Sequence, residues 1–190
     1  FANLSLVKDS SVILTSPVVV DNNGTGGNSP YYDARHPKIA LRSSTEAVIL
    51  FQAKPTQDNV YRPYIARITL SSNTATLASV REVTGFPSGD LTTGNIEDLS
   101  FGIVTSNNTA RIAFGGRSAI GTDPFQVYYT RVGLDNATVV GTPIQLSSLD
   151  NTVGLRPLPS LRLDTLNRSH IAWAVDDSIF GTAPIYYAMV

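Results

Sequence analysis

The chain has 190 residues and a formal net charge of −1, and only 15% of its residues are charged. A near-neutral chain lacks the basic face on which binding to nucleic acid by counterion release depends, so this class of partner is excluded. The longest apolar runs, such as the valines at 18–20, are too short to span a bilayer. The absence of cysteine excludes disulfides and thiol chemistry, and the presence of only two histidines argues against a multi-histidine metal site.

The N-terminal segment, residues 1–20, resembles part of a unit that recurs later in the chain. Residues 1–6 align with residues 65–70 at an offset of 64, and a further strand is expected at 12–14. Because the first residue is Phe and not Met, we expect a processed chain, a trimmed chain or a fragment.

Residues 21–28, which read Asp-Asn-Asn-Gly-Thr-Gly-Gly-Asn, precede the first full unit. This composition favours a turn-rich loop. The oxygen-bearing side chains also suit a weak Ca²⁺ site at Asp21, although their spacing differs from that of an EF-hand. No other cofactor and no other metal site are expected.

Three later segments share one plan of short strands. The second strand of each unit ends in a large aromatic residue, and the third strand starts with a tyrosine 13, 14 or 13 residues further on. These runs are rich in Val, Ile, Thr and Tyr and are bounded by Gly, Asn, Asp and Pro, which is typical of β-strands. First strands are expected near Pro37, Leu99 and Pro159, second strands at 47–51, 110–114 and 169–173, third strands at 64–68, 128–132 and 186–190, and fourth strands at 76–80 and 138–140.

Four strands in a unit of about 60 residues are typical of a β-propeller blade. We therefore expect an all-β chain of β-propeller-type four-stranded repeats, in which the aromatic ends of the second strands pack between neighbouring sheets. A β-sandwich is the alternative fold. The chain divides as one repeat region, 1–190, with a partial unit at 1–20, full units at 31–83 and 97–145, and a unit at 157–190 that lacks its last strand.

The third unit carries a resemblance to a known group. It reads Pro-Ser-Leu-Arg-Leu-Asp at 159–164, His-Ile-Ala-Trp at 170–173 and Ile-Tyr-Tyr-Ala at 185–188. This pattern resembles the repeat of secreted bacterial and archaeal β-propellers, and it is similar to sialidase-like repeats. The resemblance implies blade architecture. The Asp-box that marks sialidases, Ser-x-Asp-x-Gly-x-Thr-Trp, is absent from all three units, which argues against sialidase activity.

The number of units leaves the architecture incomplete, because three blades do not close a propeller ring. The expected partners are therefore copies of this chain or the remainder of a longer propeller. The apolar segment at 4–20 suits a strand given to a partner blade, or a strand that closes the last unit of its own chain.

The loops that would lie on one face of a propeller carry most of the charged residues. Arginine, aspartate and tyrosine there suit a glycan site, because sugars need apolar stacking and bidentate hydrogen bonds. Tyr61 is expected to add exposed aromatic surface. An ordinary set of charged loops is the alternative interpretation. The candidate ligand-binding residues are Tyr31, Asp33, Arg35, His36, Arg62, Arg117, Asp123, Arg156 and Asp176.

No catalytic pattern accompanies these residues. A glycosidase needs two carboxylates at a suitable separation, and no such pair can be recognised from sequence spacing. We therefore expect a non-catalytic binding or structural module that recognises glycans or assembles with its own copies. A sialidase-like propeller glycosidase, or a fragment of one, is the alternative.

Five Asn-x-Ser/Thr sequons and a lack of cysteine are consistent with a chain at the cell surface or outside the cell, where the sequons would carry sugar. Chance sequons in a Ser/Thr-rich β protein are the alternative. The sequon asparagines are Asn3, Asn23, Asn107, Asn136 and Asn167.

Overall fold

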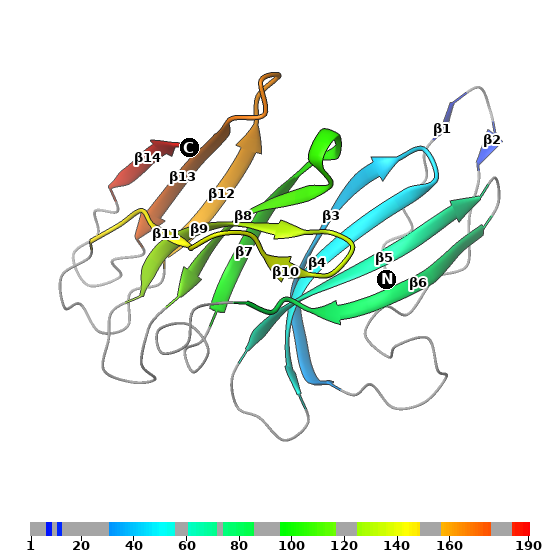
Figure 1. Cartoon of the computed structure of the whole chain (residues 1–190), viewed down its shortest axis with the longest axis horizontal. Helices are drawn as coiled ribbons and strands as arrows, with labels where there is room; N and C mark the ends of the chain where they lie inside the picture. The colour runs from blue at the N-terminus through cyan, green and yellow to red at the C-terminus, as the bar shows by residue number, and fades with distance from the viewer. Residues whose placement is uncertain are drawn as a thin grey trace.

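The computed structural model describes residues 7–8, 11–12, 31–55, 61–71, 74–85, 96–116, 125–148, 157–175 and 184–190. These residues form antiparallel β-sheets that stand side by side (Figure 1). The fold is all-β and propeller-like, as the sequence predicts. In the N-terminal segment, β1 (Val7–Lys8) pairs with β2 (Ser11–Val12) in antiparallel fashion. Of the strand expected at 12–14, Val12 lies in β2; residues 13–14, like residues 1–6, lie outside the described residues.

The first sheet follows the chain, with each strand antiparallel to the next. It consists of β3 (Tyr31–Ser43), β4 (Glu46–Pro55), β5 (Arg62–Ser71) and β6 (Thr74–Glu82). Strand β3 has register irregularities, one of them between Arg35 and Lys38. His36 lies at this point with a φ of 51°, a left-handed conformation that is uncommon for a residue other than glycine.

The second sheet repeats the same order but divides its outer strand into two short pieces. It consists of β7 (Ile96–Val104), β8 (Thr109–Gly116), β9 (Gln126–Gly133), β10 (Thr138–Val139) and β11 (Ile144–Gln145). Both β10 and β11 pair with β9. A single 3₁₀ turn, η1 (Thr105–Asn107), joins β7 to β8.

The third sheet has three described strands, β12 (Pro157–Leu163), β13 (Ser169–Val175) and β14 (Ile185–Met189), in that order. Strand β14 therefore forms one edge of the sheet within the described residues. No helix in the described part of the chain is long and apolar enough to cross a membrane.

The repeated spacing from aromatic residue to tyrosine produces the same cross-strand pair in each sheet. In all three sheets the two residues lie directly opposite each other on the second and third strands. Their rings stack with centroids 5.6 Å apart, a separation typical of favourable aromatic pairs. The pairs are Phe51 with Tyr64, Phe114 with Tyr128, and Trp173 with Tyr186.

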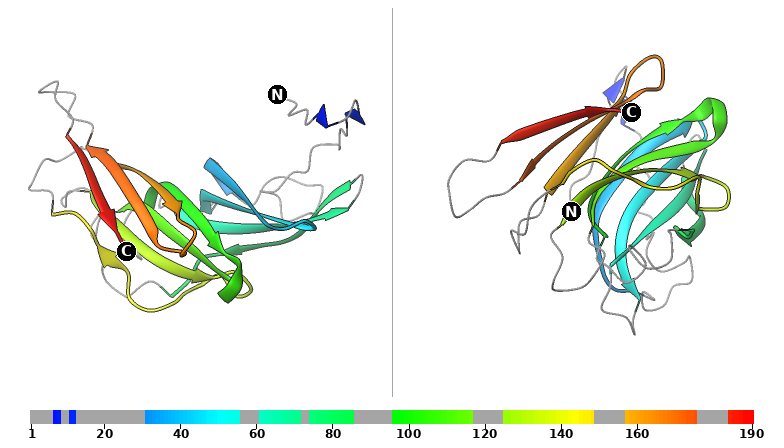
Figure 2. Two further views of the ribbon diagram at one scale, coloured as in Figure 1. Left: turned by 90° about the horizontal axis from the view of Figure 1, so that it is seen from above. Right: turned by 60° about the vertical axis from the view of Figure 1, so that its left-hand side comes forward.

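Two junctions between sheets hold most of the core (Figure 2). At the first junction, Val48 and Leu50 of the first sheet pack in one cluster with Ile112 and Phe114 of the second. The second junction, between the second and third sheets, is built by a smaller cluster that includes Tyr129, Ile171 and Trp173. The expected packing between sheets is confirmed for Phe114 and Trp173. Phe51 instead packs in a separate cluster within the first sheet.

On the face of the third sheet that points away from the second sheet, strand β14 presents apolar, exposed side chains. Ile185 is 80% exposed, Tyr187 63% and Met189 54%. These residues alternate along β14, so they share one face. Their equivalents in the first two sheets lie on faces that the following sheet covers.

Candidate functional site

The first strands of the three sheets come close together, with β7 in contact with both β3 and β12. A pocket of about 170 Å³ lies among them. His36 and Lys38 of β3 form a polar wall, to which Lys38 contributes a positive charge, whereas Leu158 and Pro159 of β12 and the buried Leu99 of β7 form an apolar one. We call this hollow the inner pocket. His36 reaches it from the irregular part of β3, where the left-handed turn interrupts the regular ladder.

A second feature of the first sheet is a buried aromatic ring covered by cations. Arg35 Cζ lies 4.9 Å and Lys54 Nζ 4.5 Å from the centroid of the Tyr61 ring, which is only 5% exposed. Such cation–π contacts hold the two cations in place. The expectation that Tyr61 offers exposed aromatic surface is therefore wrong, because the ring lies in the protein and cannot stack on a sugar.

The structure separates Arg62 from Arg35. Arg62 pairs with Ala53, and Arg35 pairs with Gln52, so their side chains alternate onto opposite faces of the first sheet. Arg62 Nη1 lies 3.3 Å from Glu82 Oε1 on its own face. One ligand therefore cannot contact both arginines on a single face of this sheet.

The other candidate residues fall into two groups. Tyr31 and Asp33 begin β3, where their backbones pair with Pro55 and Lys54. Arg117, Asp123, Arg156, Asp176 and the candidate Ca²⁺ ligand Asp21 lie outside the described residues. Among the residues that are described, no group of three acidic or histidine side chains is placed to hold a metal ion.

Three sequon asparagines lie in exposed turns between antiparallel strands. Asn107 ends the turn from β7 to β8, Asn136 lies between β9 and β10, and Asn167 lies between β12 and β13. Thr109 Oγ1 donates a hydrogen bond of 2.6 Å to Asn107 Oδ1. The sequons at Asn3 and Asn23 lie outside the described residues.

A charge cluster spans the first junction. Glu46 accepts hydrogen bonds from Arg67 Nε at 2.5 Å and from Arg42 Nη1 at 3.0 Å. Asp135, in a turn of the second sheet, lies 3.3 Å from Arg67 Nη1 and 3.6 Å from Arg42 Nη2. The hydrogen bond from Arg67 lowers the pKa of Glu46 and raises that of Arg67, against the opposing effect of partial burial.

A second charged group closes the turn between β12 and β13. Asp164 Oδ1 accepts the backbone N–H groups of Leu166 and Arg168, both at 2.9 Å. Its Oδ2 lies 2.6 Å from Arg168 Nε and 3.2 Å from His170 Nε2. Desolvation opposes ionisation of Asp164, but the hydrogen bonds from Arg168, His170 and Leu166 outweigh it and lower the pKa of the carboxyl.

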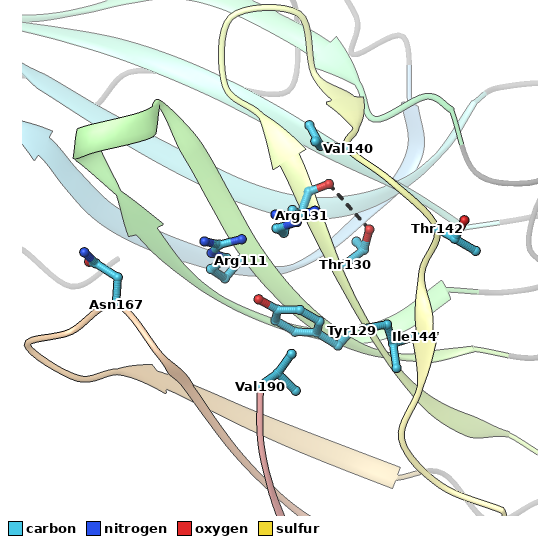
Figure 3. Close-up of a pocket in the computed structure, with 9 residues that line it drawn as sticks. All are labelled: Arg111, Tyr129, Thr130, Arg131, Val140, Thr142, Ile144, Asn167 and Val190. Carbon is cyan, nitrogen blue, oxygen red and sulfur yellow. Dashed lines mark hydrogen bonds between the residues drawn. The ribbon is translucent and has the colours of Figure 1, made fainter.

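The sequence reasoning missed a larger pocket of about 290 Å³ at the second junction, shown in Figure 3. Arg111 on β8 and Arg131 on β9 lie directly opposite each other and both line this pocket. Neither residue belongs to a motif, and both lie in the middle of strand patterns. The only signal in the sequence is their place in the repeat, three residues before Phe114 and three after Tyr128.

No protein-family model matches this chain, and no curated protein matches it. A solved structure that is similar in fold is the endo-arabinase from Bacteroides thetaiotaomicron VPI-5482, with a TM-score of 0.51 and 15% sequence identity. The similarity covers 96% of this chain and 62% of the endo-arabinase chain, so this chain spans less than two thirds of that structure. At this identity, the comparison shows a propeller-like all-β fold.

Proposed function

We propose that the chain is a carbohydrate-binding module that acts outside the cell without catalysing a reaction. The observation that carries this proposal is the inner pocket, which sets His36 and Lys38 opposite Leu158 and Pro159. Polar hydrogen-bonding groups on one wall and apolar surface on the other are the two kinds of contact that a sugar ring requires.

Three further observations support the proposal. Gln52 lies on the same face of the first sheet as Arg35. It is 1% exposed, and its Oε1 has no hydrogen-bond partner among the described residues, so a ligand hydroxyl or an ordered water would satisfy it.

The endo-arabinase with a similar fold is a carbohydrate-active protein, which is compatible with both binding and catalysis. The exposed sequons at Asn107, Asn136 and Asn167 are compatible with an extracellular location.

The test is affinity gel electrophoresis of the chain in gels containing arabinan or other plant polysaccharides, combined with an assay for released reducing ends. We expect retarded migration without release of sugar. Replacing both His36 and Lys38 by alanine removes the polar wall and should abolish the retardation. The control is Arg81→Ala, at an exposed position on the outer strand β6, which should migrate like the parent protein.

The alternative function is a glycosidase. It requires two carboxylates about 5–10 Å apart, and the described lining of the inner pocket contains none. Release of reducing ends that His36→Ala abolishes would establish the glycosidase and overturn the non-catalytic proposal. If no polysaccharide retards the parent protein, the carbohydrate-binding proposal fails.

A second candidate function is self-assembly through the third sheet, because β14 presents exposed apolar side chains on its outer face and forms its described edge. Exposed apolar patches of this kind often mark interaction sites. Sedimentation velocity of Ile185→Lys tests this candidate, and Leu166→Lys, in an exposed turn away from that face, is the matched control. Self-assembly predicts that only Ile185→Lys dissociates an oligomer, and a parent chain that sediments as a monomer would exclude it.

A further inference from the structure

The pocket at the second junction is lined by two positive charges, those of Arg111 and Arg131. In the described part of the chain, neither arginine has a carboxylate within 4.0 Å. Arg111 Nε is buried and has no hydrogen-bond partner among the residues that the structure describes. Like charges directly opposite each other on neighbouring strands destabilise a sheet, and a buried unsatisfied donor does so as well. Both costs disappear when an anion accepts from the two guanidinium groups.

The shape and lining of the pocket indicate what kind of anion fits. Figure 3 shows Arg111 and Arg131 over one opening, with Tyr129 beside them and Asn167 at the opposite side. Thr142 and apolar side chains complete the lining. A planar carboxylate accepts bidentate hydrogen bonds from guanidinium groups. A volume of about 290 Å³ lies at the small end of ligand pockets, which suits a molecule of the size of one sugar or one amino acid.

The first junction of the same chain shows what an arginine at this position binds. Arg67 lies three residues after Tyr64, as Arg131 lies three after Tyr128. Arg67 contacts two carboxylates, those of Glu46 and Asp135. The residue that corresponds to Glu46, five before the aromatic residue, is Thr109 in the second sheet. The second junction therefore keeps the arginine and has threonine in place of the glutamate.

The geometry points to a carboxylate-binding site between the second and third sheets, formed by Arg111 and Arg131. The ligand is a carboxylate on a small polar molecule, either a sugar acid or an aspartyl side chain. Tyr129, Thr142 and Asn167 supply hydrogen-bonding groups for the remainder of the molecule. This site is at a different junction from the inner pocket, so the inference does not depend on the proposed carbohydrate-binding function.

The first experiment titrates unglycosylated, ¹⁵N-labelled chain and follows the arginine Nε–Hε signals by NMR. The probes are sodium glucuronate, N-acetyl-aspartate amide and glucose, which has the sugar ring of glucuronate without the charge. We expect the Arg111 Nε–Hε signal to shift with one or both carboxylates and to stay unchanged with glucose. The tighter of the two carboxylates identifies the source of the ligand.

The matched variants separate this site from general charge effects. Arg131→Gln should weaken carboxylate binding by about tenfold or more, because it removes one of two charged donors. Arg162→Gln, which removes an exposed arginine of β12 outside the pocket, should change binding less than twofold. Equal shifts with glucose and glucuronate, or unchanged binding by Arg131→Gln, would overturn the proposal.

A second experiment uses the internal repeat and measures both stability and carboxylate binding. Thr109→Glu places a carboxylate where the first junction has Glu46. It should pair with Arg131, raise Tm by about 2–4 °C and abolish the shift caused by the added carboxylates. A Thr109→Glu variant that is no more stable than the parent and still binds carboxylates would show that this position does not face the proposed site.

Discussion

Replacing Glu46 by glutamine tests whether the charge cluster holds the first sheet to the second. Glu46 is 19% exposed and accepts from Arg67 and Arg42, which are 30% and 21% exposed. Glutamine keeps the size and one acceptor oxygen but removes the charge. The two guanidinium groups then keep a neutral amide oxygen and, as their carboxylate partner among the described residues, Asp135, which is 63% exposed and therefore more strongly screened by water.

The magnitude follows from these contacts. Hydrogen bonds to charged groups contribute about 1.5–3 kcal/mol each when buried, and partial exposure reduces this range. We therefore expect Glu46→Gln to lower the free energy of unfolding at pH 7 by about 1–2 kcal/mol. For a domain of this size, such a loss lowers Tm by about 2–8 °C.

The pKa of Glu46 determines how the stability difference between the parent and Glu46→Gln changes with pH. The hydrogen bond from Arg67 holds the pKa of Glu46 in the folded chain below the ordinary value of 4.5. A depressed pKa means that the charged form stabilises the fold, fully so above pH 4.5, and that this stabilisation disappears as the pH falls through the folded pKa. The difference in stability between parent and variant should therefore be largest near neutral pH and shrink in acid.

The assay is urea unfolding followed by far-UV circular dichroism at neutral pH and at several acidic values. Glu82→Gln is the control, because Glu82 is also paired to an arginine of the first sheet but is 34% exposed and lies away from the junction. We expect the control to cost less than about 0.5 kcal/mol. A Glu46→Gln variant that unfolds like the parent at pH 7, or a difference that persists unchanged in acid, would refute the reasoning.

Three further predictions concern the packing between sheets, and each is measured as the change in urea midpoint. Phe114→Ala should destabilise the chain by about 3–5 kcal/mol, because its fully buried ring fills the first junction, whereas Phe114→Leu should recover much of the loss. Gly102→Ala should cost about 1–3 kcal/mol, since the added Cβ would lie 2.8 Å from Leu163 Cγ on the third sheet; a neutral result would mean that β12 can move away. Ser100→Ala should cost about 1–3 kcal/mol, because it leaves the buried Leu161 N–H, 2.9 Å from Ser100 Oγ, without its acceptor, while Ser100→Thr restores a hydroxyl and should lose less.

The strand plan could be predicted from the sequence because it depends on local residue patterns and on one repeated pairing. Phe51 and Tyr64 lie opposite each other in the ladder, so their separation along the chain is fixed by the length of the connection. The same constraint acts on the other two aromatic pairs. The spacing from the aromatic residue to the tyrosine differs by at most one residue among the three sheets. This spacing was therefore sufficient to place the second and third strands of each sheet.

The candidate site was harder to predict, because it depends on the side of the sheet to which each residue points. A shift of one residue changes that side, and β3 contains several register irregularities. Arg35 and Arg62 therefore lie on opposite faces, although both belong to the predicted set. Tyr61 precedes β5 by one residue, and its ring is buried beneath Arg35 and Lys54. No pattern in the sequence indicated that these two side chains would cover the ring.

Contacts between sheets were beyond the reach of sequence spacing. Glu46 and Asp135 share an arginine although they lie far apart in the chain. Arg111 and Arg131 become a pair only when β8 and β9 align in register. The repeat nevertheless held a usable signal, because aligning the units shows that Thr109 takes the place of Glu46.

The unequal size of the two junctions has a consequence for how the chain unfolds. Sheets that contact only their neighbours behave as a linear array, in which each junction contributes its own coupling energy. The second junction has the smaller buried cluster, so the third sheet should detach first as a separate cooperative unit. The single tryptophan of the chain, Trp173, lies at this junction. Its fluorescence therefore reports the release of the third sheet, whereas circular dichroism reports the unfolding of all the sheets. The difference between the two unfolding midpoints measures how strongly the third sheet is coupled to the others.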